Sequence, residues 1–121
     1  MIKKILIALA IIAVLYFLFR PPKIKNSTNA DIIFYYGQEC SHCHNVLKYI
    51  ADNKIDEKIK IESKEVYHND ANKNELTALT RICPEISDNG NIGVPVAYIV
   101  KENKCLGGDS PIIDKLKTML Q

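Results

Sequence analysis

The sequence predicts an α/β protein in which helices pack against one mixed sheet of four strands, preceded by a separate apolar helix. β-Branched and aromatic runs at 31–36 and 96–100 are typical of buried strands. Between them lie stretches whose apolar residues recur every three or four positions, as in helices. The chain of 121 residues has room for one small domain, predicted at 31–121.

The N-terminal segment differs in kind from the rest of the chain. Lys3 and Lys4 precede an unbroken apolar run at 5–19, which Arg20 ends. This pattern fits a short membrane anchor or a secretory signal peptide. Because no small residues for cleavage follow the run directly, we predict a single-pass anchor at 1–20, with a cleaved signal or a buried core helix as alternatives. The proline-containing and polar stretch at 21–30 predicts a linker.

The charge of the chain is divided at the same boundary. From residue 31 onward there are eleven basic and fourteen acidic residues, which gives this part a net charge of −3. Nucleic-acid binding normally needs a basic face, so the composition argues against a nucleic-acid partner.

The first half of the domain predicts two strand–helix units. A strand at 31–36 is stopped by Gly37, and a helix at 41–53 follows with a single apolar stripe. The alternating segment 58–66 predicts a second strand, and 72–82 predicts a helix that ends before a proline.

The second half predicts a hairpin followed by a helix. A polar loop at 85–91 precedes a strand at 96–100, and a turn at 101–104 leads to a short fourth strand ending at Gly107 and Gly108. Ser110 is predicted to cap a last helix that runs to Leu120. The order is β-α-β-α-β-β-α, and we expect two layers, helices against one mixed sheet.

A C-x-x-C motif lies where the first strand meets the first helix of the domain. Cys40 is predicted at the helix N-terminus, where free backbone N–H groups and the helix dipole favour a thiolate. Cys43 lies on the apolar stripe one turn later, where it can attack a mixed disulfide on Cys40. His42 between them can stabilise the thiolate. We therefore predict these three as catalytic residues of disulfide exchange, with the Cys40–Cys43 disulfide as the redox group and no other cofactor.

Two other functions compete for the same two cysteines. Followed by His44, they match the C-x-x-C-H pattern of c-type haem attachment, with Met119 or His68 as a second axial ligand. Small c-type cytochromes are mainly helical, whereas this chain contains strongly strand-forming runs. With His42 or His44 the cysteines could instead bind a metal ion, as in a metallochaperone, although a structural zinc site needs four ligands.

The order of motifs resembles the thioredoxin superfamily in its small, glutaredoxin-like form. The resemblance rests on a strand, the sequence CSHC at a helix start, and Gly93-Val94-Pro95 before a hairpin and a last helix. It implies a thioredoxin-like fold and a thiol–disulfide oxidoreductase in which Cys40 is the nucleophile and Cys43 the resolving residue. It also implies that the Val94–Pro95 bond is cis and that this pair docks the backbone of a substrate.

Smaller features extend and limit this resemblance. Gly107, Gly108 and Asp109 are similar to the turn and helix start by which glutaredoxins hold glutathione, so glutathione is a candidate small thiol. The alternative is a tight strand-to-helix turn. Gly37 stands where such proteins carry a basic residue, and Phe34 stands where thioredoxins carry a buried acid.

The remaining cysteines, Cys83 and Cys105, are predicted near one edge of the sheet. A structural disulfide between them, two separate thiols, and a second redox pair all stay open. Four cysteines in an anchored domain indicate an oxidising compartment. We therefore expect a membrane protein with its redox domain outside the cytoplasm. Its expected partners are protein thiols or disulfides, a protein that recycles the disulfide, and the membrane.

Overall fold

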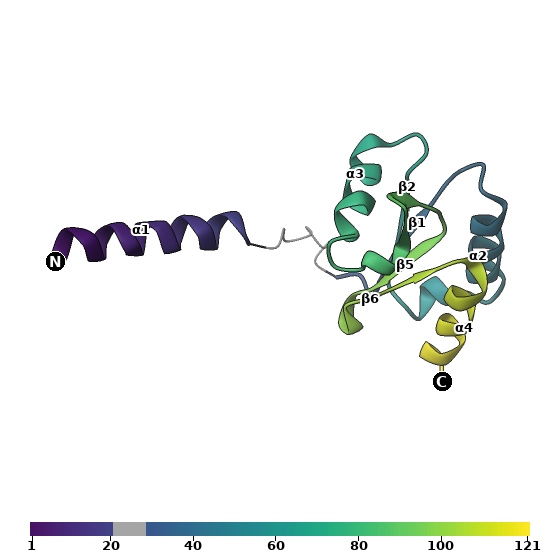
Figure 1. Ribbon diagram of the computed structural model, residues 1–121. Coiled ribbons are helices and arrows are strands. Elements are labelled where there is room, and N and C mark those ends of the chain that lie inside the picture. The colour runs from purple at the N-terminus through teal and green to yellow at the C-terminus, as the bar shows by residue number, and fades with distance from the viewer. Residues whose placement is uncertain (21–28) are drawn as a thin grey trace.

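The computed structural model describes residues 1–20 and 29–121. Four helices and a four-stranded sheet form most of it (Figure 1). The helices are α1 (Ile2–Leu18), α2 (Ser41–Asp52), α3 (Asp70–Leu79) and α4 (Asp109–Met119). The strands of the sheet are β1 (Ile32–Tyr36), β2 (Ile61–Glu65), β5 (Val96–Ile99) and β6 (Lys104–Gly107). A small separate hairpin consists of β3 (Ser87–Asp88) and β4 (Asn91–Ile92).

The sheet is mixed, with the strand order β2-β1-β5-β6. β1 runs parallel to β2 and antiparallel to β5, and β5 runs antiparallel to β6. The α2 crossover between β1 and β2 is what allows these two strands to be parallel. The predicted mixed four-stranded α/β arrangement is confirmed, and β1 and β5 are its buried central strands.

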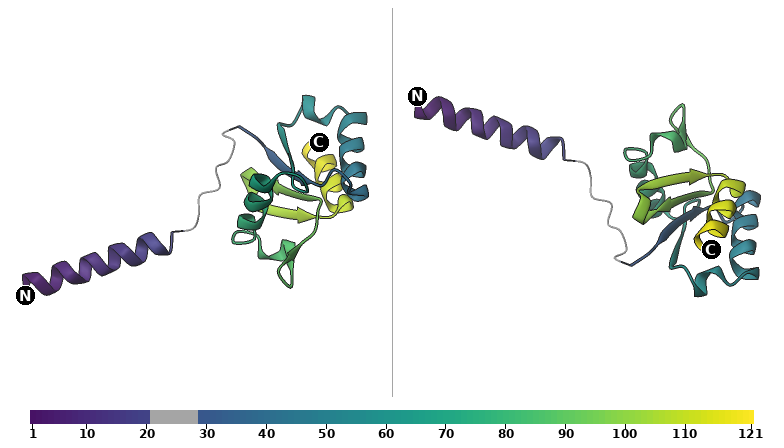
Figure 2. Two further views of the ribbon diagram at one scale, coloured as in Figure 1. Left: turned by 90° about the horizontal axis from the view of Figure 1, so that it is seen from above. Right: turned by 90° about the horizontal axis from the view of Figure 1, so that it is seen from below.

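The helices cover both faces of the sheet rather than one. Figures 1 and 2 show α3 against one face and α2 with α4 against the other. Ile32 and Phe34 of β1 belong to the core beneath α2 and α4, whereas Ile33 and Tyr35 belong to the core beneath α3. The expectation of two layers is therefore wrong. Successive side chains of a strand point to opposite faces, and a strand that is apolar at every position needs cover on both.

A partly buried polar contact joins the edge of the α3 layer to the sheet. Lys64 of β2 donates to both carboxylate oxygens of Glu75 of α3, each at 2.7 Å. The hydroxyl of Tyr35 donates to the same carboxylate at 2.7 Å. Charge-assisted bonds in a partly buried setting hold α3 in place beside the end of β2.

Several predicted boundaries differ from the structure. The segment predicted as a polar loop at 85–91 contains β3 and lies next to β4, with Asn89 and Gly90 at positive φ in the turn. A two-residue Asn-Gly turn favours a hairpin, because both of its central residues must adopt positive φ. The last helix begins at Asp109 after Gly108, so Ser110 is not its N-cap. The α3 helix starts two residues earlier than predicted because Asn69 accepts the N–H of Asn72.

The N-terminal helix forms as expected, with 17 residues from Ile2 to Leu18, none of them buried. In the described part of the chain, residues 1–20 and 29–121, no helix has the length and apolar character that crossing a bilayer requires. At 1.5 Å per residue α1 is roughly 25 Å long, short of the ~30 Å hydrocarbon layer. The predicted membrane-spanning anchor is therefore not supported. The predicted linker lies mostly outside the described residues.

Candidate functional site

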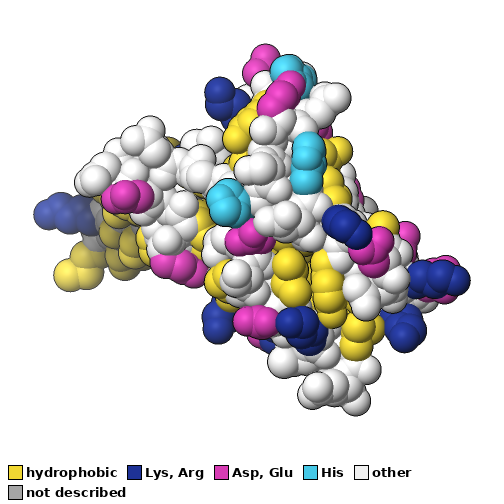
Figure 3. Space-filling model, turned by 90° about the vertical axis from the view of Figure 1, so that its right-hand side faces the viewer, with side chains coloured by type: hydrophobic (Ala, Val, Ile, Leu, Met, Phe, Trp, Pro, Cys, Tyr) yellow, Lys and Arg dark blue, Asp and Glu magenta, His cyan; other side chains and the backbone are white. Residues whose placement is uncertain are grey.

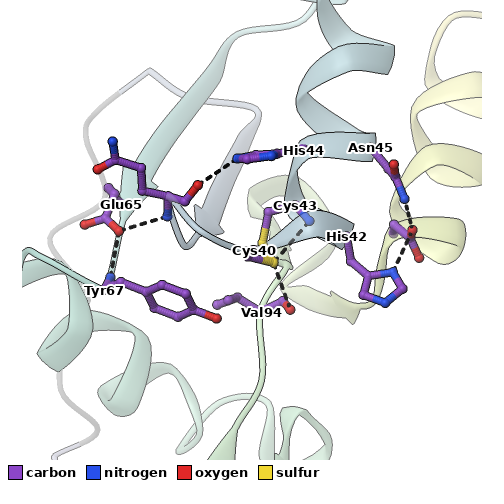
Figure 4. Close-up of a disulfide and its surroundings, with 10 residues drawn as sticks. Cys40, His42, Cys43, His44, Asn45, Glu65, Tyr67 and Val94 are labelled. Carbon is purple, nitrogen blue, oxygen red and sulfur yellow. Dashed lines mark hydrogen bonds and ion pairs between the residues drawn. A yellow bond between two sulfur atoms is a disulfide. The ribbon is translucent and has the colours of Figure 1, made fainter.

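Cys40 lies at the point where β1 has ended and α2 begins. It is the N-cap of α2, with extended backbone angles, and its Sγ accepts a hydrogen bond from the backbone N–H of Cys43 at 3.1 Å. The two residues are joined by a disulfide (Figure 4). Cys40 is 9% exposed and Cys43 is fully buried. Of the two residues, only Cys40 therefore has surface open to an approaching group.

The arrangement at Cys40 favours a thiolate once the disulfide is reduced. The N-terminus of α2 carries unpaired N–H groups and the positive end of the helix dipole. The Cys43 N–H that already points at Sγ would donate to the anion, and hydrogen bonds to a charged acceptor are the stronger ones. Both effects lower the free energy of the thiolate relative to the thiol.

The segment before β5 lies directly opposite this sulfur. The Val94–Pro95 peptide bond is cis, and the carbonyl oxygen of Val94 lies 3.6 Å from Cys40 Sγ. The carbonyl oxygen of Pro95 accepts the N–H of Gly108 at 3.0 Å. Two of the predicted segments, the proline turn and the Gly107-Gly108 turn, are thus brought together with the cysteines at the same edge of the sheet.

His42 and Asp109 form a second contact beside the disulfide. His42 Nδ1 lies 3.0 Å from Asp109 Oδ2, and the side-chain amide of Asn45 donates to the same oxygen at 2.8 Å (Figure 4). The bonds from Asn45 and His42 lower the pKa of Asp109 to about 2. The carboxylate is therefore charged at neutral pH and links the start of α4 to the first turn of α2.

Asn45 was missed by the sequence interpretation. It lies three positions after His42 on α2, so the two side chains share one face of the helix. That spacing is a weak signal by itself, because many surface helices carry polar residues at such positions. Only the packing of α4 beside α2 shows what the pair contacts.

The loop before Cys40 is tied to the loop after β2. Glu65 accepts backbone N–H groups from Gln38 at 3.2 Å and from Tyr67 and His68 at 2.8 Å each. Partial burial acts to raise the pKa of Glu65, but these three N–H groups outweigh it and lower the pKa. The loop before Cys40 is thereby hydrogen-bonded to the end of β2.

Histidine side chains gather on one face of the molecule, with acidic side chains beside them (Figure 3). His68 Nε2 lies 2.6 Å from Glu39 Oε1, and the bond to Glu39 raises the pKa of His68. His44 Nε2 donates to the carbonyl oxygen of Gln38 at 2.7 Å. His44 and His68 thus both contact the loop before Cys40, each through a different residue of that loop.

These contacts bear on the haem and metal alternatives. His44 and His68, the histidines considered as axial ligands, are bonded to Gln38 and Glu39 instead. Met119 packs against the core beneath α2 and α4. Within residues 1–20 and 29–121, no group of three or more His, Cys, Asp or Glu side chains is arranged to hold a metal ion.

Cys83 and Cys105 are joined by a second disulfide, 22 positions apart in the sequence. Cys83 follows the last turn after α3, and Cys105 lies in the edge strand β6. Both are almost fully buried, at 1% and 4% exposure, in the core beneath α3. This disulfide connects the end of the α3 layer to the sheet, away from the N-terminus of α2.

The site is thus a partly exposed disulfide at a helix N-terminus, faced by a proline turn and flanked by a histidine–carboxylate contact. This arrangement is consistent with a redox-active C-x-x-C motif. Comparison of the sequence with protein-family models found no match, and comparison with curated proteins found none either.

Proposed function

We propose that this protein is a thiol–disulfide oxidoreductase of the thioredoxin superfamily that exchanges disulfides with protein substrates through Cys40 and Cys43. The observation that carries the proposal is the position of Cys40: its Sγ caps α2, accepts the Cys43 N–H at 3.1 Å and is the more exposed sulfur of the pair. The sheet order, the cis Val94–Pro95 bond and the position of that turn support the family assignment.

The exchange takes place in two balanced steps. The Cys40 thiolate attacks one sulfur of a substrate disulfide, forms a mixed disulfide and releases the other sulfur as a thiolate. The thiol of Cys43 loses its proton and attacks Cys40 Sγ, which restores the Cys40–Cys43 disulfide and releases the second substrate sulfur as a thiolate. The substrate has then gained two electrons and the protein has lost two. The reverse sequence oxidises a substrate dithiol.

Neighbouring residues assist this exchange. Val94 and Pro95 are proposed to dock the backbone of the substrate next to Cys40. His42, when protonated, stabilises the thiolate, and Asp109 acts as a positioning residue that holds the imidazole beside α2. With this carboxylate bonded to His42 and Asn45, glutathione is proposed only as an alternative small substrate.

The second disulfide supports a location in an oxidising compartment. Disulfides are rare where glutathione and thioredoxin keep thiols reduced. A buried Cys83–Cys105 bond with no access for exchange fits a chain that folds under oxidising conditions. We propose that the redox domain lies outside the cytoplasm and that a separate redox protein recycles it.

Trapping of mixed disulfides tests the proposed roles. Cys43→Ser should accumulate mixed disulfides with substrate proteins, because the resolving attack is removed, whereas Cys40→Ser should accumulate none. The wild-type chain is the matched control and should also accumulate few. Mass spectrometry of non-reduced samples measures the adducts. Equal trapping by the two variants would contradict the assignment of nucleophile and resolving residue.

A second measurement follows the thiolate itself. The rate of alkylation of Cys40 by iodoacetamide in the reduced protein should titrate with a pKa below the ~8.5 of an ordinary cysteine. The reduced Cys43→Ser variant isolates the signal from Cys40. An ordinary or raised pKa would remove the physical basis for Cys40 as the attacking group.

A further inference from the structure

A groove lies between α3 and the β3–β4 hairpin. Its volume is about 400 Å³. We call it the hairpin groove. Apolar side chains form its floor and two amphipathic side chains its rim. The floor contains Val66, Leu76, Ile92 and Val94, and the rim contains Tyr67 and Lys73.

One lining residue of the hairpin groove contacts the reactive sulfur. Val94 lines the groove, and its carbonyl oxygen lies 3.6 Å from Cys40 Sγ. The Tyr67 ring packs over Gly37, where a Cβ atom would lie only 2.3 Å from the ring. Figure 4 shows Tyr67 and Val94 on the same side of the disulfide. A chain attached to Cys40 through a mixed disulfide can therefore extend directly into the groove.

The backbone beside the groove has a free donor. Within residues 1–20 and 29–121, the Val94 N–H has no hydrogen-bond partner, although its neighbours in β5 are paired in the sheet. A peptide lying along this segment offers carbonyl oxygens to such a donor. A small thiol has few groups to place there, so the hairpin groove fits an extended polypeptide better.

The rim residue Tyr67 is unusual for this domain. Among residues 29–121 it is the only large hydrophobic side chain that is exposed, at 54%. Tyrosine supplies a rigid apolar surface with a polar end, and such residues are enriched where proteins bind one another. An apolar side chain of the substrate would cover the ring and the groove floor together.

The positive charge of Lys73 in the groove favours an acidic group on the ligand. Lys73 is its only charged lining residue and forms no ion pair within the described ranges 1–20 and 29–121. The acids that precede the lining residues Val66 and Leu76 in the sequence are already engaged: Glu65 accepts three backbone N–H groups, and Glu75 binds Lys64. Lys73 is therefore free to pair with an acidic group on the ligand.

We propose that the hairpin groove binds the segment of a polypeptide substrate next to its reacting cysteine, with an apolar side chain on the floor and a carboxylate at Lys73. This inference rests on the proposed function, because the groove acts by placing a substrate sulfur at Cys40. The preferred substrates are thus extended, apolar and acidic near the cysteine.

Synthetic peptides test this specificity. Each peptide carries one cysteine as a mixed disulfide with thionitrobenzoate, and the reduced full-length protein releases the coloured thiolate at a measurable rate. A peptide with Leu and Glu beside the cysteine should react about threefold faster than its Leu–Lys counterpart, as expected for one exposed ion pair. It should react about tenfold faster than a Gly–Glu counterpart that lacks the apolar side chain.

Charge reversal gives the sharpest result. Lys73→Glu should reverse the preference, so that the Lys peptide reacts faster than the Glu peptide. Lys58→Glu is the matched control, since it changes the net charge equally at an exposed position outside the groove, and it should keep the wild-type preference. Tyr67→Ser should reduce the advantage of Leu over Gly. An unchanged preference in Lys73→Glu, or the same change in both charge variants, would overturn the proposal.

A small disulfide separates this proposal from the proposed function. Bis(2-hydroxyethyl) disulfide is uncharged and too small to fill the groove, so its reduction should be equal in the wild type, Lys73→Glu and Lys58→Glu. Normal turnover of this compound without peptide discrimination would refute the groove and leave the oxidoreductase intact. Failure to react with any disulfide would refute the proposed function itself.

Discussion

The two disulfides of this domain differ in sequence separation, burial and position in the fold. Cys40 and Cys43 are 3 positions apart at the start of a helix, and the outer sulfur belongs to a residue that is 9% exposed. Cys83 and Cys105 are 22 positions apart and only 1% and 4% exposed. One disulfide closes a single turn of helix, and the other connects two layers of the fold.

Their surroundings explain why only one is suited to exchange. Around Cys40 there are a backbone N–H donor, a helix N-terminus and the carbonyl oxygen of Val94. Around Cys83 and Cys105 there are mainly apolar side chains of the core beneath α3. A thiolate is stabilised in the first setting and destabilised by desolvation in the second. Reactivity is therefore decided by position in the fold rather than by the cysteine pair.

The largest expected difference is in the rates of reduction. Under limiting reductant at native conditions, the Cys40–Cys43 disulfide should be reduced at least about a thousandfold faster than Cys83–Cys105. Reduction of the latter requires opening of the core, which costs ~5 kcal/mol in a marginally stable domain. Timed alkylation followed by mass spectrometry measures both rates. Similar reduction rates for the two disulfides would contradict the distinction between an exchangeable and a structural disulfide.

Loss of the buried disulfide should have the next largest effect. The Cys83→Ala/Cys105→Ala variant should lose about 3 kcal/mol of unfolding free energy, since its bond closes a long loop in the unfolded chain. Urea denaturation followed by circular dichroism measures the loss. At temperatures where this variant is folded, it should still reduce bis(2-hydroxyethyl) disulfide at the wild-type rate. Loss of that activity in a folded variant would assign the buried pair a redox role.

A smaller effect is expected in acid. The folded-state pKa of Asp109 is about 2, below its ordinary value of 3.8. Its contribution to stability is therefore fully present above pH 3.8 and is lost as the pH falls through about 2. Asp109→Asn should remove this part of the pH dependence of the melting temperature. It should also change the reduction potential of Cys40–Cys43 and the NMR chemical shifts of the His42 ring, which a purely structural role would leave unchanged.

The control for this prediction lies on the same helix. Asp114→Asn removes an exposed carboxylate of α4 that pairs with Lys117. The Asp114→Asn variant should keep the wild-type reduction potential of Cys40–Cys43 and the wild-type NMR chemical shifts of the His42 ring. Identical behaviour of the two variants would mean that Asp109 does not position His42.

The smallest effect on stability is expected at Gly37. An alanine Cβ there would lie 2.3 Å from the Tyr67 ring, which is exposed and can turn aside. Gly37→Ala should therefore cost roughly 1 kcal/mol or less of unfolding free energy. Because the displaced Tyr67 ring is part of the rim of the hairpin groove, the variant should lose part of the preference for the Leu peptide over the Gly peptide. Normal peptide discrimination in the variant would argue against a role for Tyr67.

The parts of the site that could be predicted are those encoded by neighbouring residues. The run at 31–36 indicates a strand buried on both faces, and the apolar stripe through Cys43 indicates the helix that begins beside it. These two signals place Cys40 at a helix N-terminus, as found. Boundaries were less accurate where capping side chains decided them, as at Asn69. The small hairpin is also encoded locally, by its Asn-Gly turn.

The parts that could not be predicted join residues far apart in the chain. Asp109 and His42 are 67 positions apart, and His68 and Glu39 are 29 apart. No local pattern indicates such pairs, because their contact depends on which helices pack side by side. The hairpin groove depends in the same way on the placement of α3 against β3 and β4.

The sequence by itself determined the order of the helices and of the four strands in the sheet, the dithiol at a helix start and the proline turn, because backbone preferences and apolar periodicity act over a few residues. The tertiary structure decided that helices cover both faces of the sheet and that Val94 faces Cys40. It also separated a buried disulfide from an accessible one. Burial and long-range contact arise only when distant segments exclude water from one another, and no single segment contains that information.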